Sequence, residues 1–164
     1  MIKLGSIGMI VDNKKNFPYV KAHAAIPNGY FCTVTDTATV APTSTTVKGA
    51  DLCVVLNTAL GDNVYSDFTI ALGEYANAFL LKQWEKQYLI ADEGHITYGE
   101  GEDYTDITAG TTNLTIGTDG KLAITADVTT YLLYFAVVEK FQFNGKNAVK
   151  LRVVTVDKDT VAAG

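Results

Sequence analysis

The stretch with the most chemical character is ADEGHITYGEGEDYTD, residues 91–106. Seven of its sixteen positions are acidic or histidine: Asp92, Glu93, His95, Glu100, Glu102, Asp103 and Asp106. Carboxylates and imidazoles bind metal ions and transfer protons, so a site would be sought here first. A calcium loop of the EF-hand type needs an Asp-x-Asp-x-Asp-Gly run with a distal Glu, which GEGEDYTD lacks. We therefore interpret the stretch as an exposed, glycine-bent connection between two strands, with acids that keep it in solvent.

Two residues of this stretch remain candidates for contact with a partner. Glu100 and Glu102, two positions apart, would tune association if they faced a basic patch on another protein. His95 follows Gly94 at an expected turn, and we predict a surface or half-buried hydrogen-bonding role for it.

Other catalytic or metal-binding sets are incomplete. A zinc site would have to gather four residues from across the chain, without any C-x₂-C or H-x₃-H pair: His23, Cys32, Cys53 and His95. No serine lies in G-x-S-x-G, and neither cysteine has a neighbouring base. The sequence thus predicts no catalytic residue, no cofactor and no metal ligand. The alternative of a small hydrolase or metal-dependent binding module built on residues 91–106 stays open.

Composition narrows the class of partner. The chain has 164 residues, a net charge of −5 and a sequence pI near 4.9, and its basic residues are twelve Lys and the single Arg152. With this negative net charge we expect no basic surface of the kind that binds nucleic acid or anionic lipid. No run of eighteen apolar residues exists, so we expect no membrane span. Cys32 and Cys53 lie in apolar runs and read as buried free thiols, although a disulfide between them is left open.

The elements that would position these residues are strands. Threonine is abundant, at twenty-one residues, and short apolar runs alternate with Gly, Asn, Asp and Thr. Asn144-Gly145 predicts a type I′ hairpin turn, Asp119-Gly120 a second hairpin, and 27–29 a third turn. Residues 131–138 are apolar on both faces, which predicts a central strand covered on each side. Over 149–154, alternation predicts one buried and one partly wet face.

Residues 74–93 are ambiguous between a helix and two strands. Leu81, Trp84 and Tyr88 have helical spacing, but glycines bound the segment and β-rich neighbours surround it. We favour strands on either side of one helical turn. The expected fold is mainly β, a single antiparallel β-barrel or sandwich domain with at most one or two short helices.

The domain organisation has three parts. Residues 1–16 form an N-terminal strand or an arm, residues 17–157 a β-rich domain, and residues 158–164 a flexible tail. For 1–16 we favour a first strand of the domain over an arm that orders on a partner. Its apolar residues are the second candidate for partner contact: Ile2, Leu4, Ile7, Met9 and Ile10.

Three segments carry a resemblance to a known family. These are GDNVYSDFTIALGEYANAFLLKQWEKQYLIADEGHI, YTDITAGTTNLTIGTDGKLAI and YLLYFAVVEKFQFNGKNAVKLRVV, with a weaker echo in PNGYFCTVTDTATV. Over roughly residues 60–156 this order resembles auxiliary head proteins of tailed bacteriophages, of the capsid decoration or head-fibre-base type. The shared features are apolar patterns and turns.

The resemblance implies a non-enzymatic virion protein made in the host cytoplasm. Such a protein would bind the outer surface of the phage capsid, with the major capsid protein as partner, and stabilise the shell, as a homo-oligomer such as a trimer or as separate monomers. The alternative is another virion part, such as a tail, head-closure or fibre-associated β domain.

Overall fold

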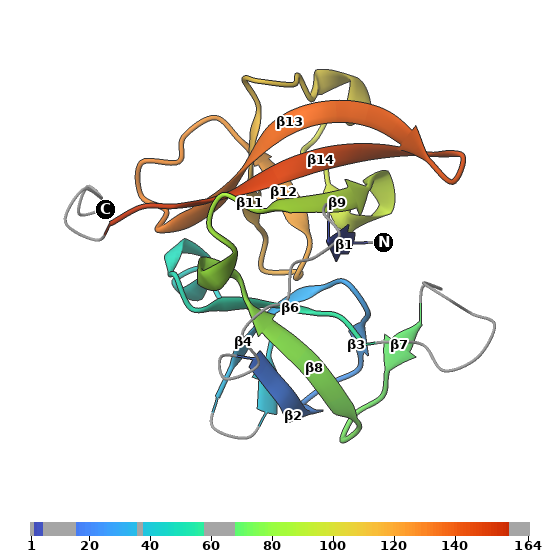
Figure 1. The fold of residues 1–164 in the computed structure, drawn as a ribbon, viewed down its shortest axis with the longest axis vertical. Helices are drawn as coiled ribbons and strands as arrows, with labels where there is room; N and C mark the ends of the chain where they lie inside the picture. Colours follow the sequence, from blue (N-terminus) through green and yellow to red (C-terminus); the bar gives the residue numbers. More distant parts are fainter. Residues whose placement is uncertain (1, 5–15, 36–37, 58–67, 158–164) are drawn as a thin grey trace.

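The regular secondary structure of the protein, seen in a computed structural model, consists mainly of β-strands (Figure 1). The structure describes residues 2–4, 16–35, 38–57 and 68–157, and side chains from residue 20 onward. Within these ranges the only helical elements are single 3₁₀ turns. The mainly-β prediction is therefore confirmed, and the architecture combines a small closed barrel with a larger open sheet.

The larger sheet has seven strands and forms the upper half of Figure 1. Their spatial order is β1 (Ile2–Leu4), β9 (Tyr88–Asp92), β14 (Lys146–Thr155), β13 (Leu133–Phe143), β11 (Asn113–Ile116), β12 (Leu122–Thr125) and β10 (Ile96–Thr97). All neighbouring pairs are antiparallel except β10 and β12, which are parallel.

The barrel lies below this sheet. Its five strands are, in spatial order, β2 (Asn16–Ala22), β5 (Ala38–Val40), β4 (Phe31–Val34), β6 (Leu52–Val55) and β8 (Tyr75–Leu80). A two-stranded ribbon of β3 (Ile26–Pro27) and β7 (Thr69–Ile70) lies beside it. The parallel pairing of β2 with β5 closes the barrel.

Strand β6 explains how the two halves are held together. All four residues of LCVV are buried, although strand residues alternate between two faces. Leu52 and Val54 pack into the core beneath the large sheet, whereas Cys53 and Val55 pack inside the barrel. A strand buried on both faces reads as a continuous apolar run, which is what this segment shows.

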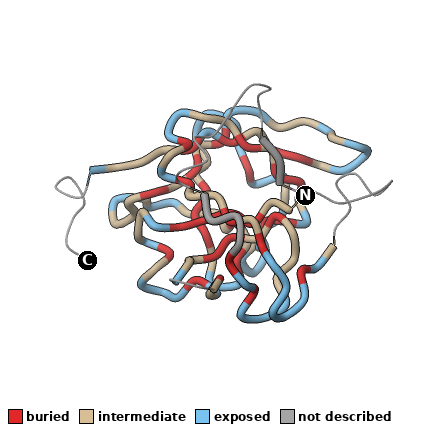
Figure 2. Tube along the Cα trace, turned by 60° about the horizontal axis from the view of Figure 1, so that its bottom comes forward, coloured by how far each residue is buried: buried red, intermediate tan, exposed pale blue. Residues whose placement is uncertain are grey.

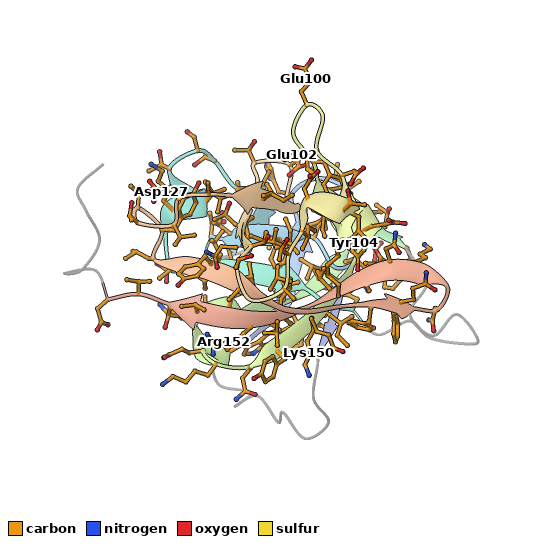
Figure 3. All side chains as sticks on the ribbon, turned by 90° about the horizontal axis from the view of Figure 1, so that it is seen from above. Glu100, Glu102, Tyr104, Asp127, Lys150 and Arg152 are labelled. Carbon is orange, nitrogen blue, oxygen red and sulfur yellow. The ribbon has the colours of Figure 1, made fainter. Side chains whose placement is uncertain are left out.

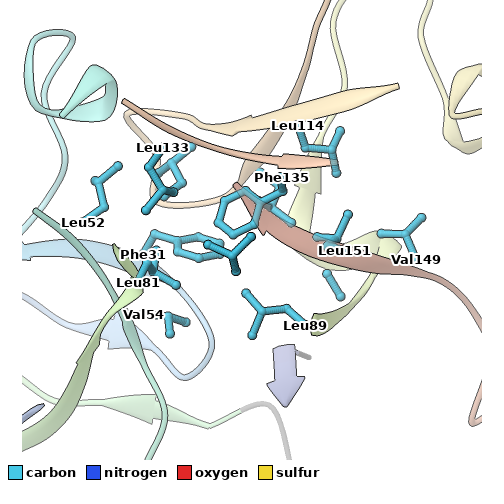
Figure 4. Close-up of a cluster of buried hydrophobic side chains, with 14 of the residues drawn as sticks. Phe31, Leu52, Val54, Leu81, Leu89, Leu114, Leu133, Phe135, Val149 and Leu151 are labelled. Carbon is cyan, nitrogen blue, oxygen red and sulfur yellow. The ribbon is translucent and has the colours of Figure 1, made fainter. Parts of the chain in front are cut away.

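The shared core fills the space between the barrel and the inner face of the sheet (Figure 4). Phe31 from β4 meets Phe135 from β13, with ring centroids 5.6 Å apart. Both rings are at most 1% exposed, so they contribute fully to the apolar area removed from water. Figure 2 shows the same arrangement along the chain, with buried segments gathered inside and exposed ones at loop tips.

The Asp119-Gly120 turn has a role beyond closing a hairpin. The predicted facing pairs are confirmed, since Leu114 pairs with Ile124 and Ile116 with Leu122. Gly120 has φ +77° and its carbonyl oxygen accepts a hydrogen bond of 2.8 Å from the amide of Phe31. A Cβ at position 120 would lie 2.8 Å from the carbonyl oxygen of Phe31, so glycine permits this backbone contact between sheet and barrel.

The C-terminal hairpin follows its sequence with one correction. Asn144 and Gly145 have φ of 51° and 74°, and Phe143 pairs with Lys146 across the turn, as a type I′ hairpin requires. The alternation over 149–154 is confirmed. The expectation that residues 131–138 are covered on both sides is wrong. Only one face of β13 packs on the core, and Val138 on the other face is 42% exposed.

The ambiguous segment folds as we favoured. β8 and β9 flank the 3₁₀ turn η3 (Leu81–Trp84), and Leu81 and Trp84 are buried in the shared core. Three more such turns occur in the described ranges: η2 (Thr46–Lys48), η4 (Glu93–His95) and η5 (Tyr104–Asp106). The turn at 27–29 is also present, with Gly29 at φ 88°.

The N-terminal candidates are only partly visible. Ile2 and Leu4 lie in β1, which pairs antiparallel with β9 at one edge of the large sheet. Ile7, Met9 and Ile10 lie outside the described residues, as does the tail 158–164.

Candidate functional site

The acidic stretch divides into two parts with different surroundings. Asp92 and His95 are each only 6% exposed, at the place where β9 ends above the barrel. The carboxylate Oδ1 of Asp92 lies 2.9 Å from Nδ1 of His95, and it also accepts a hydrogen bond of 3.1 Å from the amide of Gly94. The predicted surface or half-buried position of His95 is therefore wrong, because the turn η4 directs the ring inward.

The second ring nitrogen of His95 reaches toward the barrel. Its Nε2 lies 3.4 Å from the carbonyl oxygen of Asn28, and the ring of Tyr30 meets it edge-on at 5.7 Å. The side-chain amide of Asn28 in turn donates to the carbonyl oxygen of Asn57 and accepts from its backbone amide. Both ring nitrogens thus lie close to oxygen atoms of the fold.

The Asp92–His95 pair has the residue types of a general-base dyad but not the geometry. In such a dyad the distal nitrogen faces a nucleophile or a substrate, whereas here it faces a backbone carbonyl oxygen. Burial opposes ionisation of Asp92, but its hydrogen bond to His95 and nearby positive charge outweigh it and hold the pKa of the carboxyl well below its usual range. The pair is arranged to connect sheet and barrel.

Three of the remaining acids close turns of the loop, whereas Glu93 accepts a hydrogen bond of 2.9 Å from Nδ2 of Asn147 in β14. Glu102 accepts a hydrogen bond of 2.8 Å from the amide of Gly99, and Asp103 accepts bonds of 2.6 Å from both the amide and the hydroxyl of Thr105. Asp106 accepts from the amide of Asp103 and completes a capping box with it around η5. Glu100 stands at the exposed tip of this loop, away from the body of the molecule (Figure 3).

Two residues anchor the acidic loop to the C-terminal hairpin. The Nζ of Lys140 donates to the carbonyl oxygens of Tyr104 and Ile107 at 2.8 and 2.7 Å, and lies 4.4 Å from the centre of the Tyr104 ring. The hydroxyl of Tyr104 donates to the carbonyl oxygen of Ala148 at 2.8 Å. The loop is therefore fixed at its base while its tip is exposed.

The structure brings together only two of the four residues considered for zinc. Cys32 and Cys53 are direct partners across β4 and β6 inside the barrel, and both are free thiols. Burial raises the pKa of both, that of Cys53 to about 12. His95 lies in the pair described above, and His23 is in an exposed turn. Across the described ranges, no three His, Cys, Asp or Glu side chains are grouped as a metal site would require.

The outward face of the large sheet is a different kind of candidate. On β9 and β14 every second residue points away from the core, and the register places these residues in rows with those of β13, whose alternation is interrupted by a bulge between Val137 and Glu139. Tyr88 is opposite Arg152, and Arg152 is opposite Ala136. Ile90 is opposite Lys150, and Val154 is opposite Tyr134. The face thus combines aromatic and aliphatic residues with two cations, and one acid, Glu139 of β13, is opposite Lys150.

Sequence reasoning missed this face and the Asp92–His95 pair. The alternation over 149–154 was a signal for the face, but it did not say which residues of β9 and β13 lie beside Lys150 and Arg152. That depends on pairing between strands more than fifty residues apart. For the buried pair, only the N-cap spacing from Asp92 to Gly94 was a local signal.

Comparisons with protein-family models, curated proteins and solved structures gave no match to this chain. In the ranges that the structure describes, no helix has the length and apolar character needed to cross a bilayer.

Proposed function

We propose that this chain is a non-enzymatic virion protein that binds the outer surface of a phage capsid and stabilises the shell. Its partner is the major capsid protein. The observation that carries the proposal is where the three resembling segments lie in the fold. They supply all the described strands of the large sheet except β1, and they also supply β8 of the barrel.

The resemblance thus covers a connected unit. The segment 61–96 gives β8, η3 and β9, the segment 104–124 gives β11 and most of β12, and the segment 131–154 gives most of the final hairpin. These elements hydrogen-bond to one another in the order β9–β14–β13–β11–β12. The apolar and turn pattern of the three segments therefore falls on adjacent, hydrogen-bonded strands. This supports a shared sheet more strongly than a pattern scattered over unconnected loops would.

The use of the polar groups supports a binding role over a catalytic one. Asp92 and His95 form hydrogen bonds with each other and with the backbone of the protein. Glu102, Asp103 and Asp106 close the turns of one loop. The face of β9, β14 and β13 instead presents Tyr and Arg, two types enriched where proteins meet, beside aliphatic residues and the pair of Lys150 and Glu139.

The experiment mixes the purified protein with shells of the phage that encodes it, prepared without this protein. We expect the protein to sediment with the shells to a fixed ratio and to raise the temperature at which they disrupt, because a ligand of the assembled state stabilises it. Free major capsid subunits are the control and should bind little. The proposal would be wrong if all of the protein stayed in the soluble fraction.

Immunogold labelling of intact particles separates the head from other locations. Label on the capsid is expected. Label confined to the tail or the head–tail junction would replace this proposal with the tail, head-closure or fibre-associated alternative.

A further inference from the structure

We propose that the outward face of β9, β14 and β13 is the docking surface, and that it takes a protein surface on which carboxylates flank an apolar patch. This inference rests on the proposed function and assigns the contact to one face of the molecule. We call it the sheet face and define it by six residues: Tyr88, Ile90, Tyr134, Val138, Lys150 and Arg152.

The composition of the sheet face is that of an interface centre. Tyr88 and Tyr134 offer large, stiff side chains that lose little conformational entropy on binding, and Arg152 is the one arginine of the chain. Val138 is 42% exposed, one of three large hydrophobic residues that stand out in this way within the described ranges. Burying this exposed apolar side chain against a partner would remove apolar area from water and favour binding.

Arg152 is placed to bind a carboxylate of a partner. Its neighbours across the strands are Tyr88 and Ala136, neither of which carries a charge. Among the residues that the structure describes, no carboxylate forms an ion pair with Arg152. The guanidinium can hold a carboxylate with two parallel hydrogen bonds, so the geometry points to an acidic group opposite this position.

Lys150 contributes in a different way. It is opposite Glu139 on β13, and its Nζ lies 4.9 Å from the centre of the Tyr88 ring. The cation therefore holds the aromatic ring against the sheet and has an acidic neighbour within its own chain. Arg152 is accordingly the charged anchor, and Lys150 a positioning residue for Tyr88.

The distribution of charge favours a different protein over a second copy of this chain. Glu100, Glu102 and Asp127 lie on the side of the molecule opposite Lys150 and Arg152 (Figure 3). If the acidic loop of one copy docked on the sheet face of the next, the same two surfaces would stay free at the ends. A head-to-tail contact forms a ring only when the rotation between neighbouring copies closes, and surfaces on opposite sides of the molecule favour an open row of copies instead. A partner of different sequence ends the association at one contact.

The test uses the same shells as above and three variants: Arg152→Glu, Arg152→Lys and Lys21→Glu. Lys21 is an exposed residue of β2 on the barrel, and its reversal changes the net charge as much as Arg152→Glu does. We expect Arg152→Glu to weaken shell binding about tenfold or more, Arg152→Lys to weaken it less, and Lys21→Glu to leave it unchanged. Melting temperatures of the free variants check that each is folded.

The outcomes separate the two proposals. If the wild-type protein binds shells and Arg152→Glu binds equally well, the sheet face is not the docking surface although the proposed function stands. If the wild-type protein does not bind shells, both fail. If sedimentation velocity of the wild-type protein alone shows oligomers that Arg152→Glu dissociates, the occupant is a second copy and the inference is overturned.

Discussion

Two parts of one acidic stretch, only a few residues apart, have opposite roles in this molecule. At the end of β9, Asp92 and His95 are buried and bridge the seven-stranded sheet to the barrel. In the following loop, Glu102, Asp103 and Asp106 lie at the surface and hydrogen-bond to amides no more than three residues away. The residue types are alike, so the difference comes from their surroundings.

The comparison shows that a cluster of acids is not one feature. A buried carboxylate without a partner is costly, so its partner determines much of the local stability. An exposed carboxylate that accepts one amide fixes a turn and contributes little to the whole fold. Removing a buried acid should therefore lower the free energy of unfolding of the whole domain, whereas removing an exposed acid should affect only its own loop and by less.

The largest effect is expected from Asp92→Ala. This change leaves His95 buried without its carboxylate and the amide of Gly94 without its acceptor. Removing one member of a buried pair costs about 3 kcal/mol or more of the free energy of unfolding. Denaturant unfolding of the wild-type and variant proteins measures it.

A double variant sharpens this prediction. In Asp92→Ala/His95→Leu both members of the buried pair are replaced, so no imidazole is left buried without its carboxylate and part of the loss should be recovered. If Asp92→Ala were no more destabilising than substitutions in the exposed loop, the buried pair would contribute no more to stability than the loop acids do, and our comparison would be wrong.

A second prediction concerns acid. The pKa of Asp92 is lower in the folded than in the unfolded protein, so the unfolded chain binds more protons as the pH falls. The stabilisation is fully present above about pH 4, the ordinary range of a carboxyl, and is lost progressively below it. Melting temperatures from pH 7 down to pH 2 should fall less steeply for Asp92→Asn than for the wild-type protein.

Some of the slope should persist in that variant. The pKa values of Asp103 and Asp127 are also lowered, by hydrogen bonds from Thr105 and Thr129 respectively. If the melting temperature fell equally steeply with pH in the wild-type protein and in Asp92→Asn, the acid sensitivity would come from acids other than Asp92. The buried carboxylate would then contribute less than we argue.

Local signals in the sequence were enough for much of the fold. Asn144-Gly145 and Asp119-Gly120 set their hairpins because the turn needs positive φ at those positions, a property of the residues themselves. The strands on either side of η3 were also read correctly, since Leu81 and Trp84 anchor one turn and the flanking residues alternate. Such features depend on neighbours within about ten residues.

The features that were missed depend on distant pairing. His95 was expected at the surface or half-buried because it follows Gly94 at a turn, yet its ring is buried against Asn28 and Tyr30, which are more than sixty residues away. Likewise, the outward face of residues 131–138 was expected to be covered, because apolar residues occur at every position there. Burial of a strand on one face or both is decided by what packs on the sheet, which the strand alone does not encode.

A smaller effect is expected from Asp103→Ala. The variant loses the N-cap of η5 and both hydrogen bonds to Thr105, while Lys140 and Tyr104 still hold the base of the loop. The melting temperature should fall by less than in Asp92→Ala. Amide hydrogen exchange should rise at Thr105 and stay unchanged at Leu89 in β9. Faster exchange in β9 as well would show that the loop supports the sheet.

The smallest effect separates two glutamates two positions apart. Glu100→Lys reverses a charge at an exposed loop tip and should change the free energy of unfolding by less than about 0.5 kcal/mol. Glu102→Lys removes the acceptor of the Gly99 amide, so exchange at that amide should rise although the fold persists. Both reversals should leave shell binding unchanged, since these residues lie opposite the sheet face. Weaker binding by Glu100→Lys with an intact fold would instead place the partner at the acidic tip, because charge reversal at a contact acts on association while leaving the body of the protein untouched.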